Sequence, residues 1–420
     1  MQTRYSSVLA TVLLSQMLIA AVQKVGAIPP SPADARISAA QNRIRTNSQS
    51  WQSYNDLAVA LCRKARDTED VELYAAADAA LQRSFQLSPG NYDAQKLQVA
   101  TLLGKHKFDE ALKLATQLNH KVPDDIGGWA LLVDANIALG NYPEAEHDAQ
   151  MILDLRPGSA LGFLKAANLR ELFGDPEGAI EFYSETNRRT SGNDADEHAW
   201  LLTQIARLEL LSGNRKRTEE LLAQALKLFP NSQLALATLA KLRAAEGKNA
   251  DASAILEKRY RSVPSSQNLY DWAESLEKSG GNEAAATAFR DFEAKARTES
   301  SKSYNANRQL VFFYTDHKND GAKALALATE EVKIRHDSAT LDAYAWALYA
   351  NGKYSEAKTQ MDRALAVGVR DPVYYCHAVR IAAKANDTTS ATRFENALAG
   401  FGPNACPAQR LSQVAQEITR

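Results

Sequence analysis

Apolar residues recur at helical spacing along most of the chain. Leucine and aromatic residues stand three or four positions apart, as on one face of a helix, and strand-like runs of alternating Val, Ile and Thr are missing. Glycine and proline are sparse, at 20 and 13 of 420 residues. The pattern therefore predicts an all-α protein.

The turn residues repeat at a fixed distance. Pairs of the same residue type stand 34 positions apart: Gly140 and Gly174, Gly213 and Gly247, Pro123 and Pro157, Pro230 and Pro264. Glycine can end a helix because it accepts a left-handed backbone at low cost, and proline ends one because it lacks an N–H. Small residues keep the same step at Ala145 and Ala179, where two helices must approach closely. Each period therefore predicts a pair of antiparallel helices of about three turns.

One segment carries the whole pattern. It runs from Trp129 through Gly140, Tyr142 and Ala145 to Pro157, and it resembles the tetratricopeptide repeat. The resemblance implies a right-handed superhelical solenoid of about nine antiparallel helix pairs over residues 49–402, because one pair cannot bury its own apolar face. A two-residue insertion at Lys105-His106 is expected in the second unit.

The N-terminus is typical of a secretory signal. Arg4 precedes a mostly apolar run over residues 8–22, and Val25-Gly26-Ala27 supplies small residues for cleavage. We predict a signal peptide over residues 1–27 and an exported protein, periplasmic or secreted. An uncleaved membrane anchor is the alternative, although the apolar run is short for a span. Residues 28–48, rich in proline at the start, are expected to form a linker and the start of the first helix.

Three cysteines, Cys62, Cys376 and Cys406, leave the redox state open. An exported chain allows a disulfide between Cys376 and Cys406, which antiparallel helices would bring to one end of the last unit. It would hold an amphipathic capping helix, expected over residues 403–420, against the terminal apolar face. Three buried thiols are the alternative.

Charge and motifs narrow the function classes. The chain has 49 basic and 50 acidic residues, a net charge of −1, so nucleic acid is not an expected partner. The His-Glu-x-x-His, Gly-rich phosphate-loop and G-x-S-x-G motifs are absent from the sequence. We therefore predict no enzyme activity, no cofactor and no metal site.

The resemblance also indicates a binding face. In this family the first helix of each pair lines the concave surface, and its central inward position falls at Asp134, Asn168, Arg207, Lys241, Glu274, Trp346 and Arg380. Asn168, Arg207 and Lys241 are expected to hold a peptide backbone or a carboxylate. Trp346 and Tyr349, one turn apart, are either exposed interface anchors or packing between neighbouring repeats. Arg380 completes the predicted partner-binding set.

The leading hypothesis is a non-enzymatic scaffold outside the cytoplasm that binds a polypeptide segment in its concave groove. A first alternative is an enzyme or carbohydrate-handling protein on the same helical array, which would need acids converging in a closed pocket. A second is a membrane-tethered assembly scaffold that keeps residues 1–27 as its anchor. The implied partner is another protein or a peptide, and a membrane only if residues 1–27 remain as an anchor.

Overall fold

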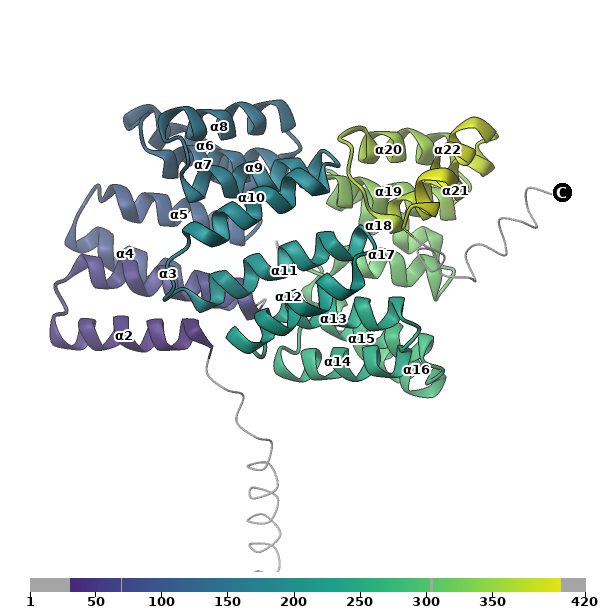
Figure 1. Cartoon of the computed structure of the whole chain (residues 1–420), viewed down its shortest axis with the longest axis horizontal. Helices are drawn as coiled ribbons and strands as arrows, with labels where there is room; N and C mark the ends of the chain where they lie inside the picture. The colour runs from purple at the N-terminus through teal and green to yellow at the C-terminus, as the bar shows by residue number, and fades with distance from the viewer. Residues whose placement is uncertain (1–30, 69, 303–304, 402–420) are drawn as a thin grey trace, which may run out of the picture.

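A computed structural model describes residues 31–68, 70–302 and 305–401, and this part of the chain is helical throughout, without a strand (Figure 1). None of the described helices is long and apolar enough to cross a membrane. The predicted signal peptide, the predicted capping helix and Cys406 lie outside the described residues. The described helices are α2 (Pro32–Thr46), α3 (Trp51–Thr68), α4 (Glu72–Leu87), α5 (Tyr92–Gly104), α6 (Phe108–Lys121), α7 (Ile126–Leu139), α8 (Tyr142–Leu155), α9 (Ala160–Leu172), α10 (Pro176–Arg189), α11 (Ala195–Leu211), α12 (Arg215–Leu228), α13 (Gln233–Ala245), α14 (Asn249–Ser262), α15 (Ser266–Lys278), α16 (Asn282–Glu299), α17 (Asn307–Asp316), α18 (Gly321–Glu331), α19 (Ser338–Ala350), α20 (Tyr354–Ala366), α21 (Pro372–Lys384) and α22 (Thr388–Ala399).

Helices α3 to α22 pair in chain order, α3 with α4 and so on to α21 with α22, and each pair packs on the next. The all-α solenoid of helix pairs predicted from the 34-residue period is confirmed. Twenty helices make ten pairs in the described part of the chain, one more than the expected nine, because degenerate units are hard to separate by sequence alone. The right-handedness of the superhelix stays a prediction.

One turn geometry joins the two helices of nine successive pairs. Its left-handed residue is glycine in six of them, but His106 (φ 56°), Asn319 (φ 51°) and Asn386 (φ 59°) take the same place in the other three. The expected insertion at Lys105-His106 is wrong. His106 stands 34 residues before Gly140 and adopts its left-handed conformation, so the period is intact and only the residue type differs.

Small side chains allow the two helices of each pair to approach closely. The position of Ala145 is small and buried in every pair from α5/α6 onward, which confirms that prediction. Its members are Ala111, Ala145, Ala179, Thr218, Ala252, Ala285, Ala324, Ala357 and Ala391. Larger side chains such as Leu118, Ile152 and Leu222 fill the space beside them and are almost fully buried. The core of the described residues is therefore a series of buried clusters that follow one another along the array.

The stretch expected as a linker and the start of a helix contains a complete helix, α2. Pro32 is its first residue, because the missing N–H and fixed φ of proline suit the first turn of a helix. Ser31 caps it, since its hydroxyl accepts from the backbone N–H of Asp34. Arg36 of α2 reaches the start of α11 and pairs with Asp196 at 2.5 Å, which ties the N-terminal helix to a helix 160 residues later.

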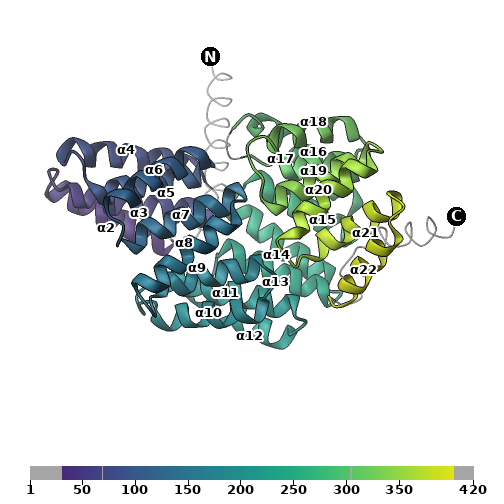
Figure 2. The ribbon, with the colours of Figure 1, turned by 90° about the horizontal axis from the view of Figure 1, so that it is seen from above.

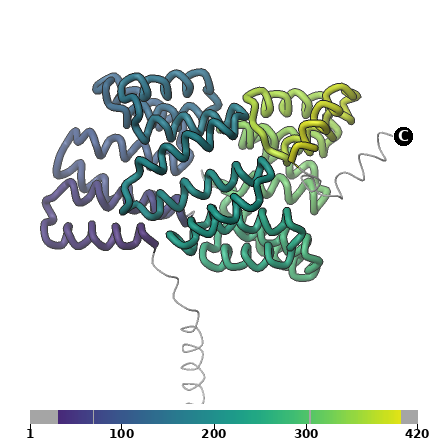
Figure 3. The backbone as a smooth tube through the Cα atoms, in the orientation of Figure 1, coloured from purple at the N-terminus to yellow at the C-terminus, as the bar shows by residue number. Residues whose placement is uncertain are grey.

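The array turns back on itself, so that late repeats lie beside early ones (Figures 2 and 3). A Cβ added at Gly174 would lie 2.2 Å from the carbonyl oxygen of Gly368, and one added at Gly140 would lie 3.0 Å from that of His336. The Tyr142 and Ser338 hydroxyl oxygens are 3.5 Å apart. We call this contact the seam. Its first side is the turns at His106, Gly140 and Gly174, and its second side is segments 335–338 and 367–371.

Candidate functional site

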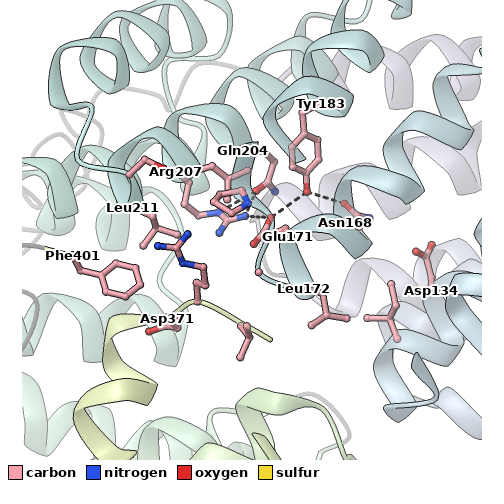
Figure 4. A pocket seen from close by; sticks show the side chains of 17 residues that line it. Asp134, Asn168, Glu171, Leu172, Tyr183, Gln204, Arg207, Leu211, Asp371 and Phe401 are labelled. Atoms are coloured by element: carbon pink, nitrogen blue, oxygen red, sulfur yellow. Dashed lines mark hydrogen bonds and ion pairs between the residues drawn. The ribbon is translucent and has the colours of Figure 1, made fainter. Parts of the chain in front are cut away.

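A cavity of about 400 Å³ lies between the two sides of the seam (Figure 4). Helices α7, α9, α10 and α11 line its first side, and residues 369–371 with Phe401 line its second. The lining is mixed, with Leu172, Leu208 and Leu211 beside polar side chains. Because the two sides are more than 150 residues apart in sequence, the cavity exists only while the array is folded back.

A polar network holds the first side of the cavity in place. Arg207 donates to Glu171 at 2.5 Å and to the side-chain oxygen of Gln204 at 2.8 Å. The Tyr183 hydroxyl donates to Asn168 Oδ1 at 2.8 Å and lies 3.3 Å from Glu171 Oε2. These bonds join α9, α10 and α11, so the side chains are ordered before any partner arrives.

Protonation in this network is fixed at neutral pH. Burial, and then the charge of Glu171, raises the pKa of Tyr183 well above its ordinary value, so the phenol keeps its proton. Burial would lower the pKa of Arg207, but the charge and hydrogen bond of Glu171 outweigh it and raise that pKa. Arg207 therefore stays charged and paired. Its positive charge is largely offset by the carboxylate of Glu171.

Three hydrogen-bonding groups in the cavity wall are left without a partner among the described residues. The side-chain oxygens of Asn168 and Gln204 both accept hydrogen bonds in the network, but their amide nitrogens form no hydrogen bond with any described residue. Arg370 is exposed and lies over the ring of Phe401 at 5.6 Å, without an ion pair in the described part of the chain. All three are donors, so the wall is suited to a ligand rich in acceptors.

Three carboxylates also face the cavity, and each is engaged. Asp134 is paired with the buried Lys165 at 2.6 Å, and Glu171 with Arg207. Asp371 caps α21 by accepting from the backbone N–H of Val373 at 2.8 Å. Each of the three therefore already accepts a hydrogen bond from another group of the protein.

The structure brings together part of the predicted partner-binding set. Asn168 and Arg207 line the cavity, as their shared inward position suggested. Lys241 is exposed on α13 and is not among the lining residues. Trp346, Tyr349 and Arg380 form a separate cluster on α19 and α21, so the predicted residues do not line one continuous groove.

Trp346 is in the core and is not an exposed anchor. It is 3% exposed, its indole N–H donates to Asp316 at 2.8 Å, and its ring stacks on His377 at 4.2 Å between centroids. Tyr349 stacks on its other face, and Arg380 lies 5.9 Å from the ring centroid. The aromatic pair therefore packs between neighbouring repeats, the alternative interpretation of the sequence, because α19 and α21 approach closely there.

The cysteine prediction remains open. Cys376 is buried on α21 beside Leu398, and Cys62 is a free thiol whose pKa burial raises to about 12. Cys406 lies outside the described residues, so the Cys376–Cys406 disulfide stays a prediction.

Sequence reasoning missed several lining residues for two different reasons. Glu171 is three residues after Asn168, and Gln204 is three residues before Arg207, so helical spacing places each on the same face as its neighbour. That signal was present in the sequence. Arg370 and Asp371 reach the cavity only because the array folds back, and no local pattern encodes this contact.

The paired helices, their 34-residue period and their common turn give the chain a tetratricopeptide-type solenoid fold. No known family profile matches the sequence, and neither does any curated protein.

Several solved structures are similar to the chain. The human IFIT1 dimer with m7Gppp-AAAA is 15% identical, with a TM-score of 0.49 over 88% of this chain and 96% of that one. The type IV pilus biogenesis factor PilW is 14% identical, with 0.42 over 49% and 94%. A tetratricopeptide repeat protein from Parabacteroides merdae is 19% identical, with 0.38 over 57% and 93%.

Proposed function

We propose that the chain is a non-enzymatic scaffold that binds a polypeptide segment in the cavity at the seam. The observation that carries the proposal is the set of unpartnered donors at the cavity. The Arg207–Glu171 network holds those on Asn168 and Gln204 in place, and Arg370 adds a third from the second side of the seam. An ordered donor set beside leucine side chains is what a short segment of main chain requires.

A polypeptide backbone fits this wall better than a polyanion. Carboxamide N–H groups donate well to peptide carbonyl oxygens, and they do so whatever the side chain of the bound residue. The cavity lining has three carboxylates, on Asp134, Glu171 and Asp371, against the guanidinium groups of Arg207 and Arg370, so it lacks the positive excess that binds a phosphate backbone. That nucleic acid is not a partner stays a prediction, and the arrangement of charge in the cavity supports it.

The proposed place of action is outside the cytoplasm. Its support is the sequence of residues 1–27, with a basic start, an apolar run and small residues at the end. The membrane-tethered alternative differs only in keeping this segment. N-terminal sequencing of the mature protein separates the two, since a chain starting near residue 28 supports export with cleavage and a chain starting at Met1 supports the anchor.

The binding proposal is tested by removing the donors. The double variant Asn168→Ala with Gln204→Ala deletes both carboxamides and leaves the Arg207–Glu171 pair. The control, Gln150→Ala with Asn193→Ala, deletes two exposed carboxamides that do not line the cavity. The unmodified chain is first used to capture proteins from an extracytoplasmic fraction. The bound complex is treated with protease, and the segment that the chain protects is identified by mass spectrometry. This segment is then made as a synthetic peptide for titration.

We expect the donor variant to bind this peptide at least tenfold more weakly than the unmodified chain, because each lost hydrogen bond contributes roughly 0.5–1.5 kcal/mol. The control variant is expected to bind normally. Equal affinity of the two variants, with unchanged helicity, would show that the cavity is not where the polypeptide binds.

A further inference from the structure

A second cavity, of about 240 Å³, lies farther along the seam and is separate from the first in its lining residues. His106 contributes from the first side of the seam. The rest of the wall comes from the α15 to α19 region, chiefly α17, α18 and α19.

The floor of the second cavity is apolar and made of small residues. Val311, Ala328, Ala339 and Ala343 line it, and three of these are at most 4% exposed. Small side chains at these positions leave open a space that leucine would fill. An apolar floor favours a ligand with an aliphatic body, because burying that body removes apolar surface from water.

The polar part of the wall is rich in donors. Arg308 is exposed at the cavity and makes no hydrogen bond or ion pair with the described residues. Gln309 is 7% exposed, and it too has no hydrogen-bond partner within the described ranges, although it lines the cavity. The Gln309 amide group therefore lines the cavity with free hydrogen-bonding capacity, which a ligand or water can use.

The other charged groups at this wall, Arg335 and Glu331, already form bonds with other residues of the protein. Arg335 bonds to Asp337 at 3.1 Å and lies over the ring of Phe108 at 5.7 Å. Glu331 is the carboxylate of the wall, and its Oε1 accepts from Asn305 at 3.2 Å and from Asn307 at 2.7 Å. The Glu331 carboxylate accepts hydrogen bonds from two carboxamides and keeps its charge, and Arg335 is paired with Asp337, so Arg308 is the guanidinium group of the wall that has no ion pair among the described residues.

We propose that the second cavity is a binding site for a small aliphatic carboxylate. The carboxylate would accept from Arg308 and from the amide nitrogen of Gln309, and the aliphatic body would lie on Val311 and the alanines. A charge-assisted bond to Arg308 provides the anchor, and the floor distinguishes an organic acid from a bare inorganic anion. This site goes beyond the polypeptide-binding function, which concerns a different cavity.

The ligand would also contact both sides of the seam. His106 lines the cavity from the first side and stacks on the ring of Phe108. Arg335, from the second side, lies over the same ring. A molecule held between them stabilises the folded-back array by mass action, because it binds only when the two sides are together.

The test uses the full chain and three probes. These are 3-methylbutanoate, its neutral amide 3-methylbutanamide, and inorganic phosphate, each titrated by saturation-transfer NMR and by thermal unfolding. Variant Arg308→Gln removes the anchor, and Ala339→Leu fills the floor. Variant Arg290→Gln, an exposed arginine on α16 outside the cavity, is the control.

We expect 3-methylbutanoate to bind the unmodified chain and Arg290→Gln alike, at least tenfold more tightly than the amide or phosphate. Both cavity variants are expected to lose at least tenfold in affinity. Arg308 is exposed, so its replacement leaves the fold intact and keeps the test decisive if Ala339→Leu is unstable. Three results would overturn the proposal: no binding of the carboxylate, equal binding by Arg308→Gln, or phosphate binding as tightly as the organic acid.

Discussion

Two sets of turns in this molecule have the same backbone but different surroundings. Gly140 and Gly174, on the seam, have a backbone carbonyl of the opposite side within 3.0 Å of where a Cβ would be. Gly213, Gly247, Gly280 and Gly352 adopt the same left-handed conformation, with φ between 72° and 86°, and have no atom within 4 Å of that point. The repeat sequence therefore specifies the conformation of each turn. The path of the superhelix determines which turns contact the opposite side of the seam.

This difference indicates how a repeat array makes a cavity between repeats that are far apart in sequence. Packing between neighbouring repeats is local, and each unit contributes much the same contact. The seam is a second kind of contact, made between units far apart, and both cavities lie along it. Variants can address the two kinds of contact separately.

The largest effect is expected from local packing. Trp346→Ala removes a buried ring that stacks on Tyr349 and His377, and it should lower the free energy of unfolding by about 3–5 kcal/mol. Peptide affinity at the first cavity should be unchanged once the protein is folded. Denaturant unfolding followed by circular dichroism, with peptide titration below the transition, measures both. A loss of affinity with unchanged stability would instead make Trp346 an interface residue.

A smaller but more specific effect is expected at the seam. Gly174→Ala and Gly213→Ala both place a Cβ on a left-handed residue, which costs roughly 1–2 kcal/mol in each case. Only the Gly174 variant also meets a backbone oxygen, at 2.2 Å, and the forced shift should cost a further ~1–3 kcal/mol. Small-angle scattering should show an expanded chain for Gly174→Ala alone. Identical stability and dimensions for both variants would contradict the contact.

The contrast between the two glycines shows what the sequence could and could not predict. The period, the helix pairs and the small buried alanines followed from residue types that each unit needs for its own packing. His106 was misinterpreted because a histidine in a left-handed turn carries no obvious sign in the sequence. The proximity of Gly174 to Gly368 depends on how far each repeat is rotated relative to the previous one, added up over several repeats. No single residue type determines that rotation, so the contact could not be predicted from the sequence.

The candidate site divides in the same way. Asn168 and Arg207 could be placed on the inward face from register alone, and helical spacing could have added Glu171 and Gln204. Arg370 comes from the far side of the seam and could not. Trp346 is at the inward position that the repeat register predicts, but the close packing of α19 on α21 buries its side chain. The register therefore predicts which way a side chain points, and it does not predict whether that side chain is exposed to solvent.

The smallest effect is expected where α2 meets α11, the polar counterpart of the seam. Burial would raise the pKa of Asp196, but the hydrogen bond and charge of Arg36, with the charge of Arg63, outweigh burial and hold that pKa below its ordinary value. A carboxyl group whose pKa is lower in the folded than in the unfolded protein stabilises the fold at pH values above its unfolded pKa of about 4. This stabilisation is lost as the pH falls through the pKa of the folded state. Asp196→Asn should therefore cost about 1–3 kcal/mol at pH 7.

The stability difference between Asp196→Asn and the unmodified chain should narrow from pH 7 to pH 3, measured by urea unfolding. Asp56→Asn, which disrupts the exposed ion pair with Arg43 at 2.8 Å, is the comparison and should change stability by less than about 1 kcal/mol. A pH-independent difference for Asp196→Asn would show that the carboxylate charge is not what ties α2 to α11.

The most direct measurement of the seam is a disulfide across it. A Cβ on Gly140 would lie 3.5 Å from the Cβ of His336, within the range of about 3.5–4.5 Å found in disulfides. In a Cys62→Ala background, Gly140→Cys with His336→Cys should form an intramolecular bond on mild oxidation, identified as a linked peptide by mass spectrometry. Gly213→Cys with His336→Cys should form none. If both pairs stay reduced and react equally fast with an alkylating agent, the array is open and the cavity at the seam does not exist.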